Sequence, residues 1–357
     1  MNSNTSHEKP NSRIDYFDFF RAIAVYAVII AHFDALSFYN TDVRTFGWQV
    51  LAVYDSIPRW TVPVYMMISG ALFLRSSASI NKILSKYFLR IIIAYFFWST
   101  AYALIRVYCG ELTGTKNIML QIIKGPDHLW YLPVIAGLYL ATPLLRKLID
   151  SQEILNYTLI ITLILSSILP LIVDTIALFS DPLYEIFTEL QGLLWSYFFH
   201  GGIFYFLCGY ELNKREIGPK LRKGIYIIGI ISLIFTIVAT LVISVWKEQA
   251  TIIYFSPCGI NTVLMSIAVF VFGKYHFSYT KVPKLVATII SQLSKKSFGI
   301  YLTHVIVIRW LHHHFGIYPL MANPIFFVPL ISAVVLIISF AITAVIQSIP
   351  ILKKYIV

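Results

Sequence analysis

The sequence predicts an all-α membrane protein, built as a single bundle of about ten transmembrane helices. Hydrophobic residues make up 58% of the 357-residue chain, and charged residues only 13%. A soluble globular domain has about 45–50% apolar and about 25% charged residues, so this composition indicates an integral membrane protein. The apolar runs are about twenty residues long, which fits spanning helices rather than the short alternating strands of an outer-membrane barrel.

Ten apolar segments are expected to cross the membrane, and no internal repeat, linker or second domain separates them. The polar residues 1–12 are expected to form a short disordered cytoplasmic tail, and residues 13–357 one membrane domain. Because the number of spans is even, both ends of the chain are expected on the same side. The spans are predicted at residues 16–38, 47–74, 86–109, 128–149, 155–173, 190–212, 224–246, 252–273, 289–312 and 325–350.

The distribution of basic residues indicates which side that is. The formal net charge is +11, but the lysines and arginines gather in alternate short loops and at the two ends, as they do on the cytoplasmic side of membranes. These segments hold 20 of the 28 basic residues, whereas residues 174–189 contain four acidic residues and no basic one. The pattern predicts cytoplasmic termini, and it argues against nucleic acid as a partner.

No pattern in the sequence indicates a metal site or a bound cofactor. The three cysteines are an odd number, widely spaced, and lack a zinc-binding pattern. His312, His313 and His314 are adjacent, and neighbouring positions on a helix point in different directions, so one metal ion would not collect all three. We interpret them as a polar run at the membrane interface, and we expect no metal.

The first predicted span contains polar side chains that a bilayer normally excludes. Arg21 and His32 are eleven residues apart, which is three helical turns plus about 20°, so they share one face and lie about 16 Å apart along the axis. Asp18 lies near the same face, three residues before Arg21. Arginine binds phosphate bidentately and histidine transfers protons, so the stripe fits a long ligand with its anionic head near the cytoplasm. The alternative is that Arg21 extends to the lipid headgroups and His32 bonds to a neighbouring helix.

Arg21, ten residues and then His32 resemble the R-x10-H signature of the integral membrane acyltransferase-3 family. Four later segments resemble motifs of the same family and follow in the family's order. They are PVYMMISGALFL (residues 63–74), KYFLRIIIAYFFW (86–98), HLWYLPVIAGLYLATPLL (128–145) and SFGIYLTH (297–304). The resemblance covers nearly the whole chain, and one departure is Ala94, where the family often has a proline.

The resemblance implies an O-acetyltransferase of the bacterial inner membrane. Members of the family move an acyl group, usually acetyl, from cytoplasmic acetyl-CoA to sugars of envelope polysaccharide, lipopolysaccharide or peptidoglycan. Membrane lipid, acyl-CoA and a glycan or lipid-linked sugar are therefore the expected partners, with acetyl-CoA as donor substrate and no bound cofactor. The chain resembles the stand-alone members of the family, which have no fused SGNH hydrolase-like domain.

The catalytic and donor-binding residues are expected to lie along the first and third spans. Arg21 and Arg90 are expected to hold the phosphates of the acyl donor, and Asp18 to orient Arg21. His32 is expected to be the catalytic imidazole. It would act as a general base on the acceptor hydroxyl, or it would take the acyl group first, and the sequence leaves both possibilities open.

Four further residues are candidates for contacting the acceptor or supporting the catalytic histidine. Trp130 and Tyr131 lie at the outer start of the fourth span, where they would stack on a sugar ring or simply belong to the interfacial aromatic belt. Tyr301 and His304 share one face of the ninth span, which could equally be a seam of hydrogen bonds between helices. His128 adds a polar group beside the aromatic pair, and it receives little weight.

Two functions from other classes compete with the enzyme. A transporter or exporter of a glycan or lipid-linked sugar would also have intramembrane charges along its path. The chain lacks the internal repeat that many transporters have, which counts against that interpretation. The second alternative is a catalytically silent partner in a polysaccharide assembly complex. Binding of acyl-CoA by the purified protein would separate the enzyme from both.

Overall fold

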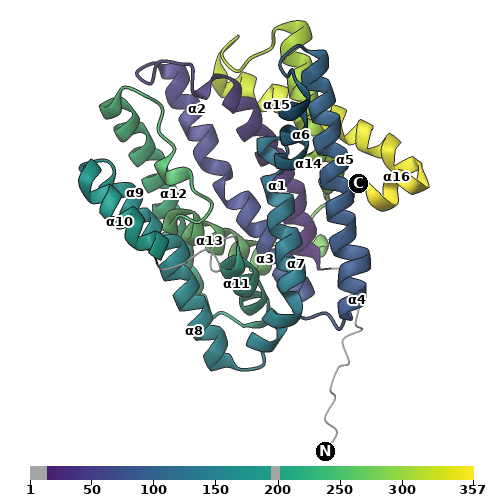
Figure 1. Cartoon of the computed structure of the whole chain (residues 1–357). Coiled ribbons are helices and arrows are strands. Elements are labelled where there is room, and N and C mark those ends of the chain that lie inside the picture. The colour runs from purple at the N-terminus through teal and green to yellow at the C-terminus, as the bar shows by residue number, and fades with distance from the viewer. Residues whose placement is uncertain (1–13, 194–201) are drawn as a thin grey trace, which may run out of the picture.

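The computed structural model describes residues 14–193 and 202–357, which form helices and contain no β-strand (Figure 1). Seven helical stretches are long and apolar enough to cross a membrane, and they coincide in order with seven of the ten predicted spans. Their α-helical parts are α1 (Asp15–Phe38), α4 (Ile80–Lys82) with α5 (Leu89–Tyr108), α7 (Tyr131–Leu148), α8 (Gln152–Leu163) with α9 (Leu169–Ile176), α12 (Pro219–Lys247), α13 (Ile260–His276) and α15 (Pro324–Ser348).

The predicted span at residues 47–74 is a broken helix. It consists of α2 (Phe46–Ser56) and α3 (Thr61–Phe73), joined by a single 3-10 turn that contains Pro58. Proline has no backbone N–H and interrupts the helical hydrogen-bond ladder, which explains why one apolar run forms two helices.

Two predicted spans remain. The span at 190–212 is only partly described, and the span at 289–312 belongs to a longer helix. Residues 194–201 of the span at 190–212 lie outside the described residues, and the rest forms α11 (Ile203–Lys214). The span at 289–312 lies within α14 (Lys284–Phe315), a helix of 32 residues. At 1.5 Å per residue α14 is about 48 Å long, which exceeds the hydrocarbon core of about 30 Å. The total of ten spans therefore stays a prediction.

Three short helices lie outside the predicted spans or at their ends. α6 (Thr115–Lys124) and α10 (Asp181–Leu193) occupy connections, and α16 (Pro350–Tyr355) follows α15. α16 projects from the side of the bundle in Figure 1, and the chain then returns to α5. There the Trp98 indole Nε1 donates a hydrogen bond to the Ile356 carbonyl at 3.1 Å. The predicted cytoplasmic tail, residues 1–12, lies outside the described residues.

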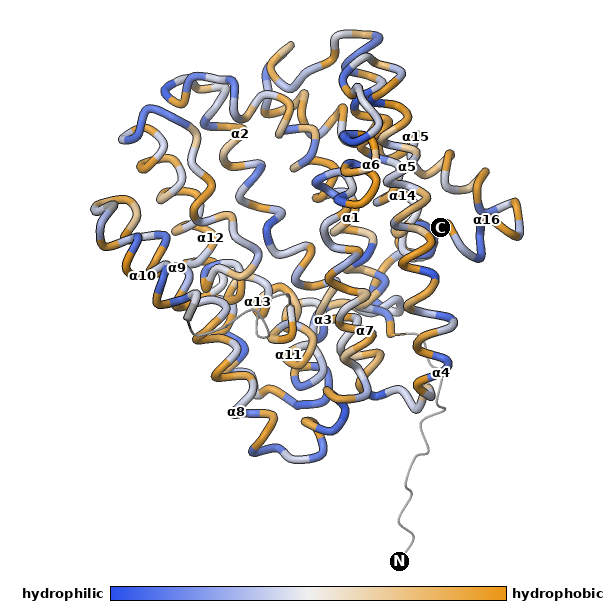
Figure 2. The backbone as a smooth tube through the Cα atoms, in the orientation of Figure 1, coloured by the Kyte–Doolittle hydropathy of each residue, from blue (hydrophilic) through white to orange (hydrophobic). Residues whose placement is uncertain are grey.

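The helices differ in how much of their surface is covered by protein. About half of the apolar window is buried in α1 (50%) and in the stretch that ends with α13 (56%), but only 22% in α15 and 28% in α12. Figure 2 shows hydrophobic residues along the lengths of the helices and hydrophilic residues gathered at the two ends of the bundle. Apolar side chains left outside a core in this way need a lipid environment. The protein is therefore a multi-pass membrane protein with α1 near its centre.

Close backbone packing holds α3 against α11. At Gly70 of α3, an added Cβ would lie 1.8 Å from the Phe206 carbonyl oxygen of α11, and at Gly209 of α11 it would lie 2.1 Å from that of Met67. Only glycine permits such an approach, as is common where membrane helices pack tightly. Gly70 belongs to the second family-like motif, so this motif has a structural role at the α3–α11 contact.

Candidate active site

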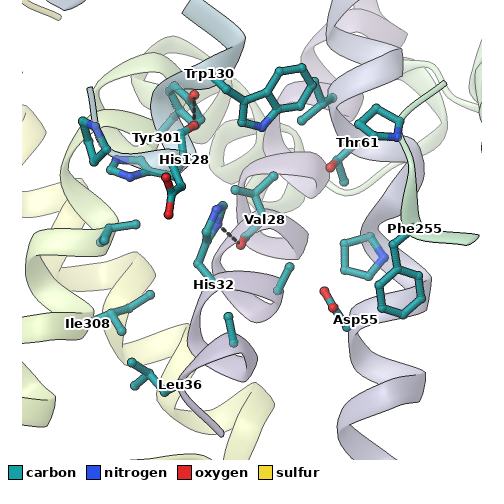
Figure 3. A pocket seen from close by; sticks show the side chains of 18 of the residues that line it. Val28, His32, Leu36, Asp55, Thr61, His128, Trp130, Phe255, Tyr301 and Ile308 are labelled. Atoms are coloured by element: carbon teal, nitrogen blue, oxygen red, sulfur yellow. Dashed lines mark hydrogen bonds between the residues drawn. The ribbon is translucent and has the colours of Figure 1, made fainter. Parts of the chain in front are cut away.

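A cavity of about 1030 Å³ opens beside the C-terminal half of α1. Figure 3 shows His32 and His128 on one side of it, and Asp55 and Phe255 on the other. Its walls come from α1, the turn between α2 and α3, the end of α5, α6, the segment before α7, residues 252–258 and α14. The polar and aromatic lining residues are His32, Tyr39, Asp55, Arg59, Thr61, Tyr102, Arg106, Gln121, Asp127, His128, Trp130, Phe255, Cys258, Tyr301 and Arg309.

Hydrogen bonds determine which ring nitrogen of His32 carries its proton. Nδ1 of His304 lies 2.7 Å from the Tyr301 carbonyl oxygen and 3.2 Å from that of Ile300. Carbonyl oxygens only accept, so this Nδ1 carries the proton and Nε2 of the neutral His304 ring is an acceptor. Nδ1 of His32 lies 3.2 Å from that Nε2 and 2.9 Å from the Val28 carbonyl oxygen. Both of its partners accept, so we infer that His32 is protonated at Nδ1 and that Nε2 holds the free lone pair.

His128 joins His32 and His304 in a cluster of three imidazoles. Its ring centroid lies 5.9 Å from that of His32 and 5.5 Å from that of His304. Its side chain is buried against the Tyr102 ring at 4.7 Å, and its carbonyl oxygen accepts a hydrogen bond of 2.5 Å from the Tyr301 hydroxyl. Sequence reasoning gave His128 little weight, because nothing in the linear order indicates that these three helical segments meet.

The opposite side of the cavity holds an ion pair that the sequence analysis did not identify. The Arg59 guanidinium forms a salt bridge with the Asp55 carboxylate and stacks 4.0 Å above the centre of the Phe255 ring. Asp55 is 6% exposed, so this pair is held inside the protein. A signal was present, since two opposite charges four residues apart within an apolar run suggest a functional position.

The predicted donor-binding residues lie away from this cavity, near the N-terminal end of α1. The Asp18 carboxylate accepts hydrogen bonds from the Ser294 hydroxyl at 2.6 Å and the Tyr279 hydroxyl at 2.9 Å. It lies 3.8 Å from Nη1 of Arg21, and the Tyr65 hydroxyl donates to the Arg21 carbonyl oxygen at 3.0 Å. Asp18 is therefore held by other segments of the chain and is placed to orient Arg21, whose side chain remains 30% exposed.

Arg90 lies at the same end of the bundle as Arg21. Ser294 of α14 donates to the Asp18 carboxylate beside Arg21, and Arg90 lies over the Phe298 ring about one turn further along α14, so the two predicted phosphate-binding arginines lie near the same part of α14. Arg90 also donates a hydrogen bond of 2.5 Å to the Val357 main-chain oxygen and lies 5.7 Å from the centre of the Phe298 ring. Along α1, Arg21 is about 16 Å from His32.

The four predicted acceptor or supporting residues have different positions. Trp130 and Tyr301 line the cavity, and His304 contacts His32 from behind. Tyr131 is not among the lining residues. Its ring lies between those of Tyr65 and Tyr301, with centroids 6.3 and 6.2 Å away. Tyr131 therefore packs between the cavity and the Arg21 cluster rather than at the rim where the sequence suggested an acceptor.

Within the described residues, no group of histidine, cysteine, aspartate and glutamate side chains has the arrangement that a metal ion requires. The three imidazoles form hydrogen bonds and ring contacts with one another and with tyrosines instead. His312, His313 and His314 are exposed and do not line the cavity. The chemistry that these side chains can supply is proton transfer and nucleophilic attack by imidazole.

Comparison with known proteins gives one family. A family model described as an acyltransferase domain matches residues 14–344, which is almost the whole chain. No curated protein matches, and no solved structure matches.

Proposed function

This chain belongs to the acyltransferase-3 family, and from that premise we propose that it transfers an acetyl group from acetyl-CoA to a hydroxyl of an envelope polysaccharide or lipid-linked sugar. It would do so as a protein of the bacterial inner membrane, with ten spans and both termini in the cytoplasm. One observation carries the proposal. The histidine whose Nε2 lone pair is free lines a large cavity, and Arg21 lies about 16 Å away along the same helix, with Arg90 of α5 at that end of the bundle.

The arginine cluster supports a donor with phosphate groups. Arg21 and Arg90 present planar guanidinium groups, which bind phosphate oxygens in pairs. Coenzyme A carries several phosphates at one end and its thioester at the end of a long flexible arm. A donor held by Arg21 and Arg90 would extend along α1, and its thioester would reach His32. In this arrangement Arg90 would exchange its contact with Val357 for a phosphate.

His32 has the properties that acyl transfer requires. Its Nδ1 proton is held by the Val28 carbonyl oxygen and by His304, so Nε2 is available either to remove a proton or to attack a carbonyl carbon. Both roles use the same lone pair and the same position. The orientation by His304 matters because an imidazole with the other tautomer would present a proton where a lone pair is needed.

The cavity supports a sugar-containing acceptor. Its volume of about 1030 Å³ is at the upper end of ordinary small-molecule sites. Trp130 and Tyr39 offer flat, half-exposed or exposed rings at its rim, and the Asp55–Arg59 pair offers charged hydrogen-bonding groups opposite them. Flat apolar faces beside polar groups match a sugar ring, which has apolar C–H faces and hydroxyl edges.

Direct binding and product analysis test this function. Purified protein in nanodiscs should bind acetyl-CoA, and cells that contain the gene should carry acetyl groups on an envelope glycan that are missing from cells without it. Failure of the purified protein to bind any acyl-CoA would contradict the proposal and favour a transporter or a silent assembly partner. Mass analysis of the glycans would also identify the acceptor.

Cysteine labelling tests the proposed orientation. A single cysteine replaces Gly218, where nothing lies within 4 Å of an added Cβ, and in a second protein a cysteine replaces Thr113 in the connection that precedes α6. Both are made in a background without the natural cysteines. An impermeant thiol reagent added to intact cells should label position 113 and not position 218. The reverse pattern would invert the topology and place the arginine cluster outside the cytoplasm.

A further inference from the structure

The third imidazole of the cluster has a ring nitrogen for which the protein supplies no partner. His128 is 6% exposed, and its Nε2 atom is buried and makes no hydrogen bond within the described part of the chain. Buried polar atoms are nearly always satisfied, so an exception needs an explanation. Because His128 lines the cavity, a ligand in that cavity is the natural partner for this nitrogen.

The backbone and the ring of His128 are held firmly in place. The Tyr301 hydroxyl donates to the His128 carbonyl oxygen at 2.5 Å, and the Tyr102 ring packs against the imidazole with centroids 4.7 Å apart. The Tyr102 hydroxyl donates its hydrogen bond to the Leu302 carbonyl oxygen at 2.9 Å, so it does not donate to His128. An imidazole that is fixed by its neighbours but keeps an unsatisfied nitrogen is suited to meet a substrate in one orientation.

The distance between His128 and His32 suits a shared substrate atom. Their ring centroids are 5.9 Å apart, at an interplanar angle of 77°, and the two rings form no hydrogen bond with each other. A proton-transfer contact spans about 2.6–3.2 Å between heavy atoms. The two rings are thus close enough to border the same substrate group without bonding to each other.

We propose that His128 is a catalytic residue that removes the proton of the acceptor hydroxyl, while His32 carries the acyl group. The inference rests on the proposed acyltransferase function, and it assigns separate roles to two imidazoles where the sequence suggested one. His304 then serves as a positioning residue, because its contact with Nδ1 keeps the Nε2 lone pair of His32 free for attack.

The chemistry balances over two steps. In the first, Nε2 of His32 attacks the thioester carbonyl, the new C–N bond forms, the C–S bond breaks, and coenzyme A leaves as a thiolate that takes a proton from solvent. His32 is then a cationic acyl-imidazolium that keeps its Nδ1 proton. In the second, the acceptor oxygen bonds to the acyl carbon and its proton passes to Nε2 of His128. The C–N bond breaks, its electron pair returns to His32, and His128 releases its proton to solvent.

The experiment uses two small acceptors that differ in their need for a base. Wild-type protein in nanodiscs receives acetyl-CoA with either water alone or hydroxylamine, and we measure acetate and acetohydroxamate. Water needs a base to attack, whereas hydroxylamine is an uncharged nucleophile at neutral pH. His128→Gln should lower acetate formation by about 100-fold, a typical contribution of a general base, and should leave acetohydroxamate formation unchanged.

Two further variants make the comparison specific. His32→Gln should abolish both products and so defines the background rate. His313→Gln, an exposed histidine outside the cavity, should change neither. Retained acetohydroxamate formation also reports that the His128→Gln protein is folded and acylated.

Other results would overturn the inference. An equal loss of both products in His128→Gln would mean that the side chain only maintains the shape of the site, and no loss of either would mean that it has no catalytic part. If the wild-type protein forms neither product and releases no coenzyme A, the proposed function itself fails, and this inference fails with it.

Discussion

The polar groups at the two ends of α1 differ in how fully the protein satisfies their hydrogen bonds. At the end near Asp18, hydrogen-bonding capacity is taken up by the protein, since Ser294 and Tyr279 both donate to the Asp18 carboxylate. At the cavity end, the Nε2 atoms of His32 and of the neighbouring His128, which lies before α7, make no hydrogen bond within the described residues. In the proposed function, the first end holds the charged group of the donor and the second end reacts.

This difference shows how one membrane helix can serve two tasks. Charged and polar groups inside a membrane protein are costly, so they persist where binding or chemistry depends on them. The Arg21 cluster offers positive charge with a partly exposed guanidinium, which suits reversible binding of an anion. The histidine cluster places the His32 and His128 imidazoles on a large cavity, which suits reaction with a bound substrate.

The largest expected effect is at the reactive half. His32→Ala should abolish acyl transfer, a loss of at least the roughly 10²–10⁴-fold typical of a general base, because it removes the imidazole that bears the free lone pair. The protein should remain folded and in the membrane, since His32 borders a cavity and contributes little packing. His313→Ala is the matched control. Normal activity of His32→Ala at normal abundance would reduce His32 to a structural residue.

A smaller loss is expected when the orientation of His32 is disturbed. His304→Phe removes the acceptor that faces Nδ1 of His32, and we expect a loss of about 10–100-fold, as when partners that orient metal-bound histidines are removed. His304→Gln should recover part of the rate, because its amide oxygen can accept the same hydrogen bond. Turnover by each variant is compared with its affinity for acetyl-CoA. A parallel loss of donor affinity would contradict a role confined to the reactive half.

The close packing of α3 against α11 gives a prediction about stability. In Gly70→Ala the new Cβ would lie 1.8 Å from the Phe206 carbonyl oxygen, so α3 and α11 must move apart, at a typical cost of about 1–3 kcal/mol. Gly137→Ala in α7 meets nothing within 4 Å and should be neutral. Thermal unfolding of the two proteins in detergent gives the comparison. Equal stabilities would mean that the close α3–α11 contact does not contribute to the stability of the bundle.

The sequence predicted much of the fold and one part of the site, the placement of Arg21 and His32 on one face of α1. The helices recognised by length and hydropathy, such as α1, α12 and α15, agree with the structure because lipid imposes both properties on each helix separately. The distance between Arg21 and His32 and their shared face could be calculated because both residues lie on one regular helix. Family membership, expected from five motifs in order, is confirmed.

What the sequence did not predict depends on contacts between distant segments. His32, His128 and His304 meet only because α1, the turn before α7 and α14 pack together, and no spacing in the chain encodes that meeting. The contact between Arg90 and Val357 joins residues 267 positions apart. The break at Pro58 was missed because the flanking apolar runs are continuous in hydropathy, although proline made it readable.

The central claim is that the donor is bound at the arginine half and reacts at the histidine half. The most direct test measures acetyl-CoA affinity of Arg21→Lys and His32→Ala in nanodiscs, with Arg44→Lys, an exposed arginine paired with Glu248, as the control. Lysine keeps the charge but loses the planar fork, so Arg21→Lys should bind more weakly by about 1–3 kcal/mol. His32→Ala and the control should bind like the wild-type protein. Unchanged affinity in Arg21→Lys together with lost affinity in His32→Ala would reverse the two halves and contradict the account.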